Sequence, residues 1–360
     1  MRVLYCSYSV IPSNYANSIA VMQQCSALNK EVSLRVVLIR GDSCETSVFQ
    51  QYSVSKFPLY RLPKWCLKYN EMGLKIAMLL HIFLWHPNLV YTRDILLNSC
   101  LCTFHVPNIY EIHQLDMEDA EFDVLFKHIL SKIKKNKFLR SIVCISGSLK
   151  EECIQFGIPE EKISVLHNGV SLYSNREEMT NVTIPEFEKD RPLAIYVGSL
   201  QKGKGIEVIV KMAELSDHYN YLIIGGKKGT IRETENLKHI SQVTNEVARE
   251  YMKKADFLLL PMVSQRYKFH SPLKLFEYLA AGKPIIASMN EDIAEILTDK
   301  ENVMIAEENN PMDFIRCMDL LDRSDELKER IGRNSVKTAT EFTWEKRAYA
   351  ISELIERVIK

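Results

Sequence analysis

The sequence is poor in glycine, contains no C-x-x-C pair and carries no net charge. Glycine accounts for 13 of the 360 residues, about half the usual share of roughly 7%, which argues against long glycine-rich phosphate loops. The nine cysteines include no C-x-x-C pair. We therefore expect reduced core thiols in a cytosolic protein, and neither a disulfide framework nor a zinc site.

Long apolar runs and an excess of one charge are absent as well. The most apolar run, Ile76–Trp85, has ten residues and includes a histidine. It is too short to cross a bilayer and is expected to form a buried amphipathic helix. The N-terminus shows no secretory signal. Basic and acidic residues number 46 each, and this balance gives no indication of nucleic-acid binding.

The residues that are present predict two α/β domains, because 360 residues at about 150 per domain suggest two cores. Short β-rich runs alternate with segments whose apolar residues recur every three or four positions, such as Ala16–Lys30. This alternation favours parallel sheets with helices on both faces. The predicted strands are Arg2–Ser9, Ser33–Arg40, Asn88–Thr92, Asn108–His113, Ser141–Ser146, Lys162–Asn168, Pro192–Ser199, Tyr221–Gly226, Asp256–Pro261 and Lys283–Ser288.

A polar stretch divides the two series of strands. Residues Ser171–Arg191 contain a proline and no apolar periodicity, which is typical of an interdomain linker. We expect a first domain over residues 1–174, a linker over 175–191 and a second domain over 192–342. The last residues, 343–360, are helical in pattern and are expected to cross back onto the first domain.

Two segments of the second half suggest a phosphate site. In the segment Phe269–Ser288, Ser271 and Pro272 are suited to the N-cap and first turn of a helix that Gly282 can end. A helix that begins there places free backbone N–H groups at the edge of a sheet, which suits a diphosphate. The segment Ala194–Glu207 combines a strand end with a basic loop and a helix start, and the alternative for this loop is a solvated lysine turn.

Four motifs in this order are similar to retaining glycosyltransferases of family 4. SPLKLFEYLAAGKPIIAS resembles the donor-site helix of that family, YVGSLQKGKGIE its diphosphate loop, KADFLLLP the following strand, and ISGSLKEECIQFGIPEEKISVLHNGV the end of its first domain. The resemblance implies the α/β GT-B fold, two doubly wound Rossmann-like domains that face each other across a cleft, with the acceptor on the first and the donor on the second. The SPLKLFEY variant indicates a subfamily of bacterial polysaccharide and glycoconjugate enzymes.

The resemblance assigns the donor-site helix in part. Glu277 matches the second of two family glutamates, which binds the ribose, but Phe269 occupies the position of the first. The sugar hydroxyl then needs another partner, such as His270 or the backbone N–H groups of Ser271 and Leu273. A glutamate solvated on a helix surface is the alternative for Glu277.

On the diphosphate loop, the family's Gly-Arg pair reads Gly198-Ser199. Lys204 matches the family's lysine, and Lys202 could replace the missing arginine. The expected donor-binding residues are Gly198, Ser199, Lys202, Lys204, His270, Ser271, Pro272, Leu273, Lys274 and Glu277.

In the first half, His113 ends a predicted strand, where cleft residues of α/β domains gather. The resemblance implies that His113 approaches the donor sugar and phosphate. Glu111 points to the same side of the strand and could orient His113, or it could belong to a buried ion pair. Further acceptor-side candidates, each of which could instead be an ordinary polar loop residue, are Asn14, Asn17, Ser18 and Arg93 with its neighbour Asp94.

A basic stretch suggests a membrane partner. Six cations lie between Lys127 and Arg140, interleaved with apolar residues. They could hold the protein on an anionic membrane face, or they could form a solvated helix face. We accordingly expect a cytoplasmic protein with peripheral contact at the inner face of the plasma membrane.

These observations predict a retaining hexosyltransferase that moves a sugar from a nucleoside-diphosphate donor to a glycan or lipid-linked glycan hydroxyl. No Asp-x-Asp motif is present, so neither a metal nor another cofactor is expected, and Lys204 is predicted to stabilise the leaving group. As the family's retention is usually explained, the leaving phosphate oxygen accepts the acceptor's proton. The alternative is a non-catalytic nucleotide-sugar-binding scaffold. An NAD-dependent oxidoreductase is disfavoured because no G-x-G-x-x-G follows a strand. The sequence does not identify the transferred sugar, the nucleotide base, the acceptor or the oligomeric state.

Overall fold

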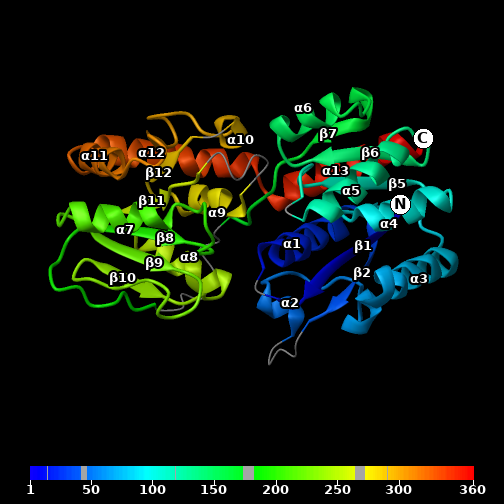
Figure 1. Ribbon diagram of the computed structural model, residues 1–360, viewed down its shortest axis with the longest axis horizontal. Coiled ribbons are helices and arrows are strands. Elements are labelled where there is room, and N and C mark those ends of the chain that lie inside the picture. Colours follow the sequence, from blue (N-terminus) through cyan, green and yellow to red (C-terminus); the bar gives the residue numbers. More distant parts are fainter. Residues whose placement is uncertain (14, 42–46, 118, 173–181, 264–271, 290) are drawn as a thin grey trace. The chain divides into compact units, whose positions relative to one another are not determined.

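The computed structural model describes residues 1–13, 15–41, 47–117, 119–172, 182–263, 272–289 and 291–360. The chain divides into two compact units (Figure 1). Unit 1 comprises Met1–Gly169 together with Trp344–Lys360, and unit 2 comprises Val170–Thr343. The last helix of the chain is therefore part of the unit that contains the first strand.

Unit 1 is built around a parallel sheet of seven strands in the order β3-β2-β1-β4-β5-β6-β7. The order proceeds outward from β1 in both directions, which is the doubly wound arrangement that places binding residues at the carboxyl ends of the central strands. The strands are β1 (Arg2–Ile11), β2 (Ser33–Arg40), β3 (Leu59–Leu62), β4 (Leu89–Thr92), β5 (Asn108–Ile112), β6 (Leu139–Cys144) and β7 (Ile163–Val165).

The helices of unit 1 connect these strands, and α13 packs along α1. In α13 the residues Trp344, Ala348, Ile351 and Ile355 are buried; their spacing of three and four places them on one face. The helices are α1 (Ala16–Glu31), α2 (Val48–Gln51), α3 (Lys68–Trp85), α4 (Ile95–Thr103), α5 (Ala120–Ile133), α6 (Gly147–Gln155) and α13 (Trp344–Ile359), with 3-10 turns η1 (Lys64–Leu67) and η2 (Glu160–Lys162).

Unit 2 repeats the same architecture with a parallel six-stranded sheet in the order β10-β9-β8-β11-β12-β13. Its strands are β8 (Leu193–Val197), β9 (Asn220–Ile224), β10 (Leu237–Ile240), β11 (Phe257–Leu260), β12 (Ile285–Ser288) and β13 (Met304–Ala306). Its helices are α7 (Ile206–Leu215), α8 (Asn245–Lys253), α9 (Leu273–Ala281), α10 (Glu291–Ala294), α11 (Pro311–Asp322) and α12 (Asp325–Glu341).

The predicted class of two doubly wound α/β units is confirmed, and each of the ten predicted strands is present. Three further strands, β3, β10 and β13, were not predicted. All three are edge strands and have only three or four residues. An edge strand is covered on fewer sides than a central one, so it does not need the continuous apolar run by which buried parallel strands are recognised.

The prediction that Ile76–Trp85 is a buried helix is wrong for one face of the helix. This run lies in α3, where Leu74 and Met78 are buried in the core that β1 and β4 share. The opposite side is exposed, and Phe83 is 72% exposed. One buried residue at every third or fourth position is enough to attach the helix to the sheet. The apolar residues on the other side of the helix therefore need not be buried.

Two expectations about the chain's class can be compared with the structure. The eight cysteines among the described residues are free, and all except Cys100 are buried, which confirms reduced core thiols for these positions. In the described part of the chain, no helix combines the length and the apolar character needed to cross a membrane.

Candidate active site

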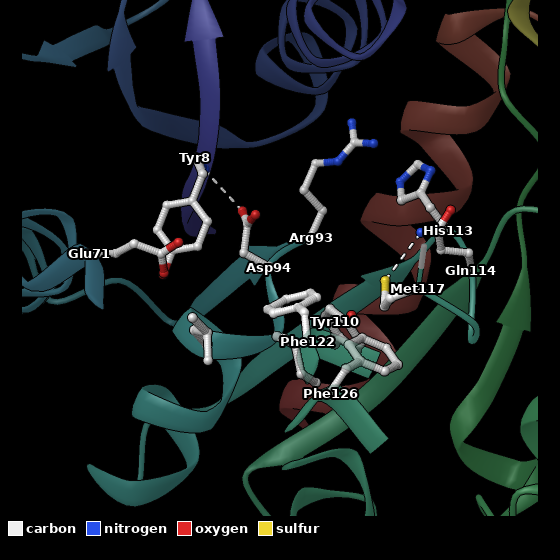
Figure 2. A pocket seen from close by; sticks show the side chains of 12 residues that line it. Tyr8, Glu71, Arg93, Asp94, Tyr110, His113, Gln114, Met117, Phe122 and Phe126 are labelled. Atoms are coloured by element: carbon white, nitrogen blue, oxygen red, sulfur yellow. Dashed lines mark hydrogen bonds between the residues drawn. The ribbon is translucent and has the colours of Figure 1, made fainter. Parts of the chain in front are cut away.

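Unit 1 contains a pocket at the carboxyl ends of β1, β4 and β5 (Figure 2). Its volume is about 240 Å³. Tyr8 comes from β1, Arg93 and Asp94 follow β4, and His113 follows β5. The remaining wall is mainly aromatic and apolar and is formed by Ile95, Leu96, Tyr110, Met117, Phe122 and Phe126, with Glu71 and Gln114 adding polar groups.

The carboxyl group of Asp94 lies in this pocket with a raised pKa. Its Oδ2 accepts the backbone N–H of Tyr8 at 3.1 Å. Burial raises the pKa of Asp94 to about 6, although the positive charge of Arg93 acts in the opposite direction. A carboxylate with a raised pKa is a stronger hydrogen-bond acceptor than one in water, which suits it to hold a hydroxyl group.

Glu71 and Tyr8 place two further oxygen atoms at the wall of the pocket. Glu71 lies in the first turn of α3 with φ of 64°, a left-handed conformation that is uncommon outside glycine, and burial raises its pKa. Among the described residues, Glu71 Oε2 and Tyr8 Oη are buried atoms without a hydrogen-bond partner of good geometry. The two groups lie beside each other, and the Tyr8 hydroxyl acts to lower the pKa of Glu71, against the effect of burial.

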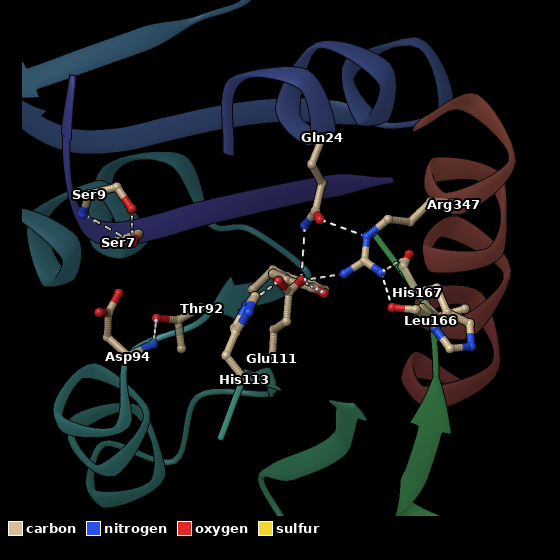
Figure 3. A network of polar contacts seen from close by, with 11 residues as sticks. Ser7, Ser9, Gln24, Thr92, Asp94, Glu111, His113, Leu166, His167 and Arg347 are labelled. Carbon is tan, nitrogen blue, oxygen red and sulfur yellow. Dashed lines mark hydrogen bonds and ion pairs between the residues drawn. The ribbon is translucent and has the colours of Figure 1, made fainter. Parts of the chain in front are cut away.

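Behind the pocket, Glu111 is the centre of a buried polar network (Figure 3). Arg347 of α13 donates to Glu111 Oε2 from Nη2 at 3.0 Å, and Tyr91 and Gln24 donate to the same oxygen. Arg347 also donates to the carbonyl oxygens of residues 166 and 167. Burial alone would raise the pKa of Glu111, but Arg347 and the other positive groups hold it well below its usual range.

The network also determines the protonation of His113. His113 Nε2 lies 2.7 Å from Glu111 Oε1, and an ionised carboxylate can only accept a hydrogen bond. Burial and the charge of Arg93 lower the pKa of His113 to about 4, so the ring is neutral at pH 7. We infer that Nε2 carries the proton and that Nδ1 presents a lone pair. Glu111, which is 2% exposed, thus positions His113 from inside the core.

The polar residues at the start of α1 are placed differently from one another. Ser18 is fully buried and its hydroxyl donates to the carbonyl of Val10 at 3.2 Å, so it fastens α1 to β1. Asn17 is exposed, and Asn14 lies outside the described residues. Of the acceptor-side candidates that the structure describes, Arg93 and Asp94 line the pocket.

In unit 2, the loop after β8 is held by three hydrogen bonds. The N–H of Val197 donates to Tyr278 Oη at 2.8 Å, the N–H of Gly198 donates to the carbonyl of Ile224 at 2.9 Å, and Tyr196 Oη donates to the carbonyl of Ser199 at 2.8 Å. Tyr278 comes from α9. The loop therefore has a defined conformation beside α9.

Two lysines from distant parts of unit 2 come together at this loop. A Cβ atom on Gly198 would lie 2.6 Å from Lys274 Nζ, and that ammonium lies 3.7 Å from the centre of the Tyr196 ring. Burial and the positive charge of Lys204 lower the pKa of Lys274 well below its ordinary value. Burial also lowers the pKa of Lys204. The two lysine side chains thus repel each other when both are protonated. A bound anion would offset this repulsion.

Glu277 lies on α9 in a polar contact that the sequence did not predict. Arg249 of α8 binds it with both nitrogens, Nε to Oε2 at 2.8 Å and Nη2 to Oε1 at 3.0 Å, and Asn245 donates to Oε1 at 3.2 Å. Glu277 keeps 14% of its side chain exposed, against 5% for Arg249. Part of the Glu277 side chain therefore stays within reach of a ligand.

The start of α9 differs from the expectation. Pro272 is the N-cap residue and the helix begins at Leu273, so Pro272 precedes the first turn instead of occupying it. Gly282 ends the helix with φ of 67°, as predicted. Pro272, Leu273 and Lys274 are half-buried, while Ser199 and Lys202 are exposed. Three residues that the sequence singled out lie outside the described residues, namely Phe269, His270 and Ser271.

The basic stretch of residues 127–140 is partly neutralised by its surroundings. Lys127 pairs with Asp116 at 2.6 Å and with Asp123 at 3.0 Å, and Lys134 donates to the carbonyl of Phe156 at 2.7 Å. The other cations of the stretch, Lys132, Lys135, Lys137 and Arg140, are exposed. In the part of the chain that is described, no three His, Cys, Asp or Glu side chains are grouped so that they could hold a metal ion.

Comparison with known proteins identifies the family. Residues 21–173 match the profile described as glycosyltransferase family 4, and residues 179–338 match that of glycosyl transferases group 1. The chain belongs to the family 4 glycosyltransferases. A glycosyltransferase of Methanocaldococcus jannaschii, named as uncharacterized, is 26% identical over 263 residues, which are 70% of this chain and 69% of the relative.

Other relatives extend this comparison. The N,N'-diacetylbacillosaminyl-diphospho-undecaprenol alpha-1,3-N-acetylgalactosaminyltransferase of Campylobacter jejuni is 23% identical over 242 residues, which are 62% of each chain. Among solved structures, HepE from Anabaena in complex with UDP superimposes with a TM-score of 0.75 at 12% identity and covers 99% of this chain and 100% of its own. The predicted GT-B fold of this glycosyltransferase is thereby confirmed.

Sequence reasoning missed several residues that shape these sites. Arg249 and Arg347 are 4% and 5% exposed, and each occupies a buried position within a helix that is otherwise apolar on that face. An arginine at such a position signals a buried carboxylate partner, and this signal could have been used. Glu71 and Tyr8 gave no signal, because only the tertiary structure brings the first turn of α3 beside β1.

We predict that Glu111→Gln destabilises the glycosyltransferase by about 3–5 kcal/mol, because the buried Arg347 guanidinium loses its charged partner. The matched control is Glu345→Gln, which removes the exposed pair with Lys30 at 3.2 Å and should cost at most about 1 kcal/mol. Urea unfolding of both variants measures the difference. Equal, small losses in both variants would show that the Glu111 network does not stabilise unit 1.

Proposed function

We propose that this glycosyltransferase transfers a hexosyl group from a nucleoside-diphosphate sugar to a hydroxyl of a carbohydrate or lipid-linked glycan. We further propose that the anomeric configuration is retained and that protein cations, without a metal ion, balance the charge of the diphosphate. The observation that carries this proposal is the approach of Lys204 and Lys274 beside the glycine of the β8 loop.

The lysine pair suits the leaving group of such a transfer. The diphosphate gains negative charge as the sugar–oxygen bond breaks, so cations that are already in place bind the transition state more strongly than the ground state. Gly198 allows Lys274 to lie against the loop, since any Cβ there would collide with it. Tyr196 and Tyr278 hold the loop in position, so little reorganisation is needed when the diphosphate binds.

Glu277 supports the nucleotide side of the proposal. Its carboxylate is oriented by Arg249 and Asn245, and 14% of its side chain is exposed, so a ribose hydroxyl can approach it. In HepE, which shares the fold, UDP is the bound nucleotide. We take a uridine diphosphate sugar as the first candidate donor for this enzyme.

The pocket of unit 1 supports the acceptor side. Carboxyl groups that accept hydrogen bonds, Asp94 and Glu71, lie in it together with the aromatic rings of Tyr110 and Phe122. Sugars present hydroxyl groups at their edge and C–H groups on their face, so a carboxylate beside an aromatic ring suits them. The acceptor of the Campylobacter jejuni relative is lipid-linked, as its name states.

We propose retention of the anomeric configuration because Glu111, the buried carboxylate beside His113, is already engaged within the protein. Glu111 is buried, and its oxygens bind Arg347, His113, Tyr91 and Gln24, so it is not available as a nucleophile. In the proposed reaction, the acceptor oxygen attacks the anomeric carbon on the face that the diphosphate leaves. The leaving phosphate oxygen takes the acceptor's proton, and His113 Nδ1 accepts a hydrogen bond from a sugar hydroxyl.

A thermal-shift panel of UDP, GDP, ADP, CDP and dTDP tests the nucleotide site. A ligand present at 100 times its dissociation constant adds about 2.7 kcal/mol to the stability of the protein. One nucleotide should raise the melting temperature of the parent protein, and Glu277→Gln should reduce that shift. The absence of a shift with all five nucleotides would contradict the donor site. A shift without turnover of any donor would favour the non-catalytic scaffold.

We predict that Lys204→Ala lowers kcat about a hundredfold or more, comparable to the removal of one preorganised transition-state donor. The matched control is Lys202→Ala on the same loop, because Lys202 is exposed and should cost markedly less. Release of the nucleoside diphosphate measures both. EDTA should leave the parent rate unchanged. A near-normal Lys204→Ala variant together with loss of activity in EDTA would assign the diphosphate charge to a metal instead.

The raised pKa of Asp94 predicts a pH dependence. If ionised Asp94 holds the acceptor hydroxyl, kcat/KM for the acceptor should fall as the pH decreases through about 6, where Asp94 becomes protonated. Asp94→Asn should lower kcat/KM by about 10-fold to 150-fold, the value of one hydrogen bond to a charged group. The variant should also lack the acidic limb between pH 5 and 7. An unchanged limb in Asp94→Asn would assign the titration to another group.

A further inference from the structure

The solvent side of α3 is apolar along most of its length. Its most exposed side chains form one set, which we call the α3 apolar face, and their exposed fractions lie between 51% and 73%. At 100° per residue these positions fall within one third of the helix circumference. The α3 apolar face consists of Met72, Ile76, Leu80, Phe83 and Leu84.

This face is not the one that attaches α3 to its own unit. Leu74 and Met78 are fully buried against the sheet, and that side accounts for the position of the helix. A surface helix normally opposes its buried side with charged or polar residues. Contiguous exposed apolar residues of this kind mark an interaction surface.

Aromatic residues continue the surface beyond the helix. Trp65 is 65% exposed and Tyr60 is 40% exposed. Trp65 belongs to η1, which packs closely on α3. Gly73 of α3 permits this packing, since a Cβ there would lie only 2.8 Å from the Cα of Cys66 in η1. Tryptophan and tyrosine are enriched where proteins meet the headgroup region of a bilayer, since one end of the ring system is apolar and the other is polar.

The charge around the α3 apolar face has one sign. Between Lys56 and Lys75 the sequence contains five basic residues and one acidic residue, although the whole chain has no net charge. The acidic residue is Glu71, which lines the pocket of unit 1. The basic residues of this segment are Lys56, Arg61, Lys64, Lys68 and Lys75. This composition complements an anionic surface and not a cationic one.

We propose that the α3 apolar face binds the surface of an anionic lipid bilayer, with α3 lying in the interface. A convex helix with aliphatic and aromatic side chains on its outer side and basic residues around it is the form in which interfacial helices bind. From Met72 to Leu84 the face extends about 18 Å at a rise of 1.5 Å per residue. Because Glu71 belongs to the same helix, this contact brings the pocket of unit 1 near the bilayer.

This surface differs from the basic stretch of residues 127–140. Two of the cations there are engaged by carboxylates or by a carbonyl, and the first turn of α5 carries the acidic residues Glu121 and Asp123. The most exposed apolar side chains of α5 are Val124 and Leu125, at 70% and 44%, next to Asp123. They provide a matched control for an exposed apolar pair with an acidic neighbour.

Sedimentation with phosphatidylglycerol-containing vesicles tests the proposal on the full-length chain. The parent should bind these vesicles and bind neutral phosphatidylcholine vesicles at least tenfold more weakly. Leu80→Ser/Phe83→Ser/Leu84→Ser should reduce binding at least tenfold. Val124→Ser/Leu125→Ser and Lys132→Gln/Lys135→Gln should reduce it less than threefold. All these positions are exposed, so circular dichroism should show an unchanged fold.

Tryptophan fluorescence gives a second measurement. The vesicles should shift the emission of the parent to shorter wavelength, and Trp65→Phe should remove most of the shift. Of the other two tryptophans, Trp344 is buried at 3% exposure, and Trp85 packs against the core of unit 1 with the Arg35 guanidinium 4.6 Å from the centre of its ring. Vesicle binding that survives the triple serine variant, or that is lost only in the lysine variant, would overturn the proposal. The proposal would also be overturned if the parent protein did not bind vesicles and sedimentation velocity showed a dimer that the triple serine variant does not form.

Discussion

The cost of removing an ionised group from water governs both halves of this glycosyltransferase. In unit 1 a partner of opposite charge offsets that cost: Glu111 is ionised inside the core because Arg347 and its neighbours bind it. In unit 2 the charge that acts most directly on buried Lys274 is that of another lysine, Lys204. The first arrangement is complete within the protein, whereas the second is completed by an anionic substrate.

Both arrangements depend on where the doubly wound fold places the ends of its strands. Glu111 and His113 follow each other at the end of β5, and Arg347 reaches them from α13, more than two hundred residues later in the chain. In unit 2, Gly205 has φ of 71°, and a Cβ there would lie 1.6 Å from the carbonyl oxygen of Pro261. Glycine at this position lets the start of α7 approach β11 closely, and this approach shapes the loop that carries Lys204.

The sequence predicted much of this structure, and the failures have identifiable causes. The central strands were predictable because strands buried on both faces need continuous apolar residues, as in Phe257–Leu260. The resemblance singled out Lys204 and Gly198, and their part in donor binding stays a prediction. Arg249 and Arg347 were not predicted as partners, because an arginine on the apolar face of a helix indicates a buried carboxylate but does not show which one. The exposure of Phe83 was missed for a related reason, since apolar spacing alone does not show which side of a helix is covered.

Proton uptake on nucleotide binding tests the central claim most directly. If Lys204 and Lys274 have lowered pKa values because they are buried together, a bound diphosphate should raise both pKa values and draw protons from solution. Isothermal titration of UDP at pH 8 in buffers of different ionisation enthalpy measures this uptake. The account predicts net uptake that is lost in Lys274→Met and absent with uridine. Binding of UDP without proton uptake, or equal affinity for UDP and uridine, would contradict it.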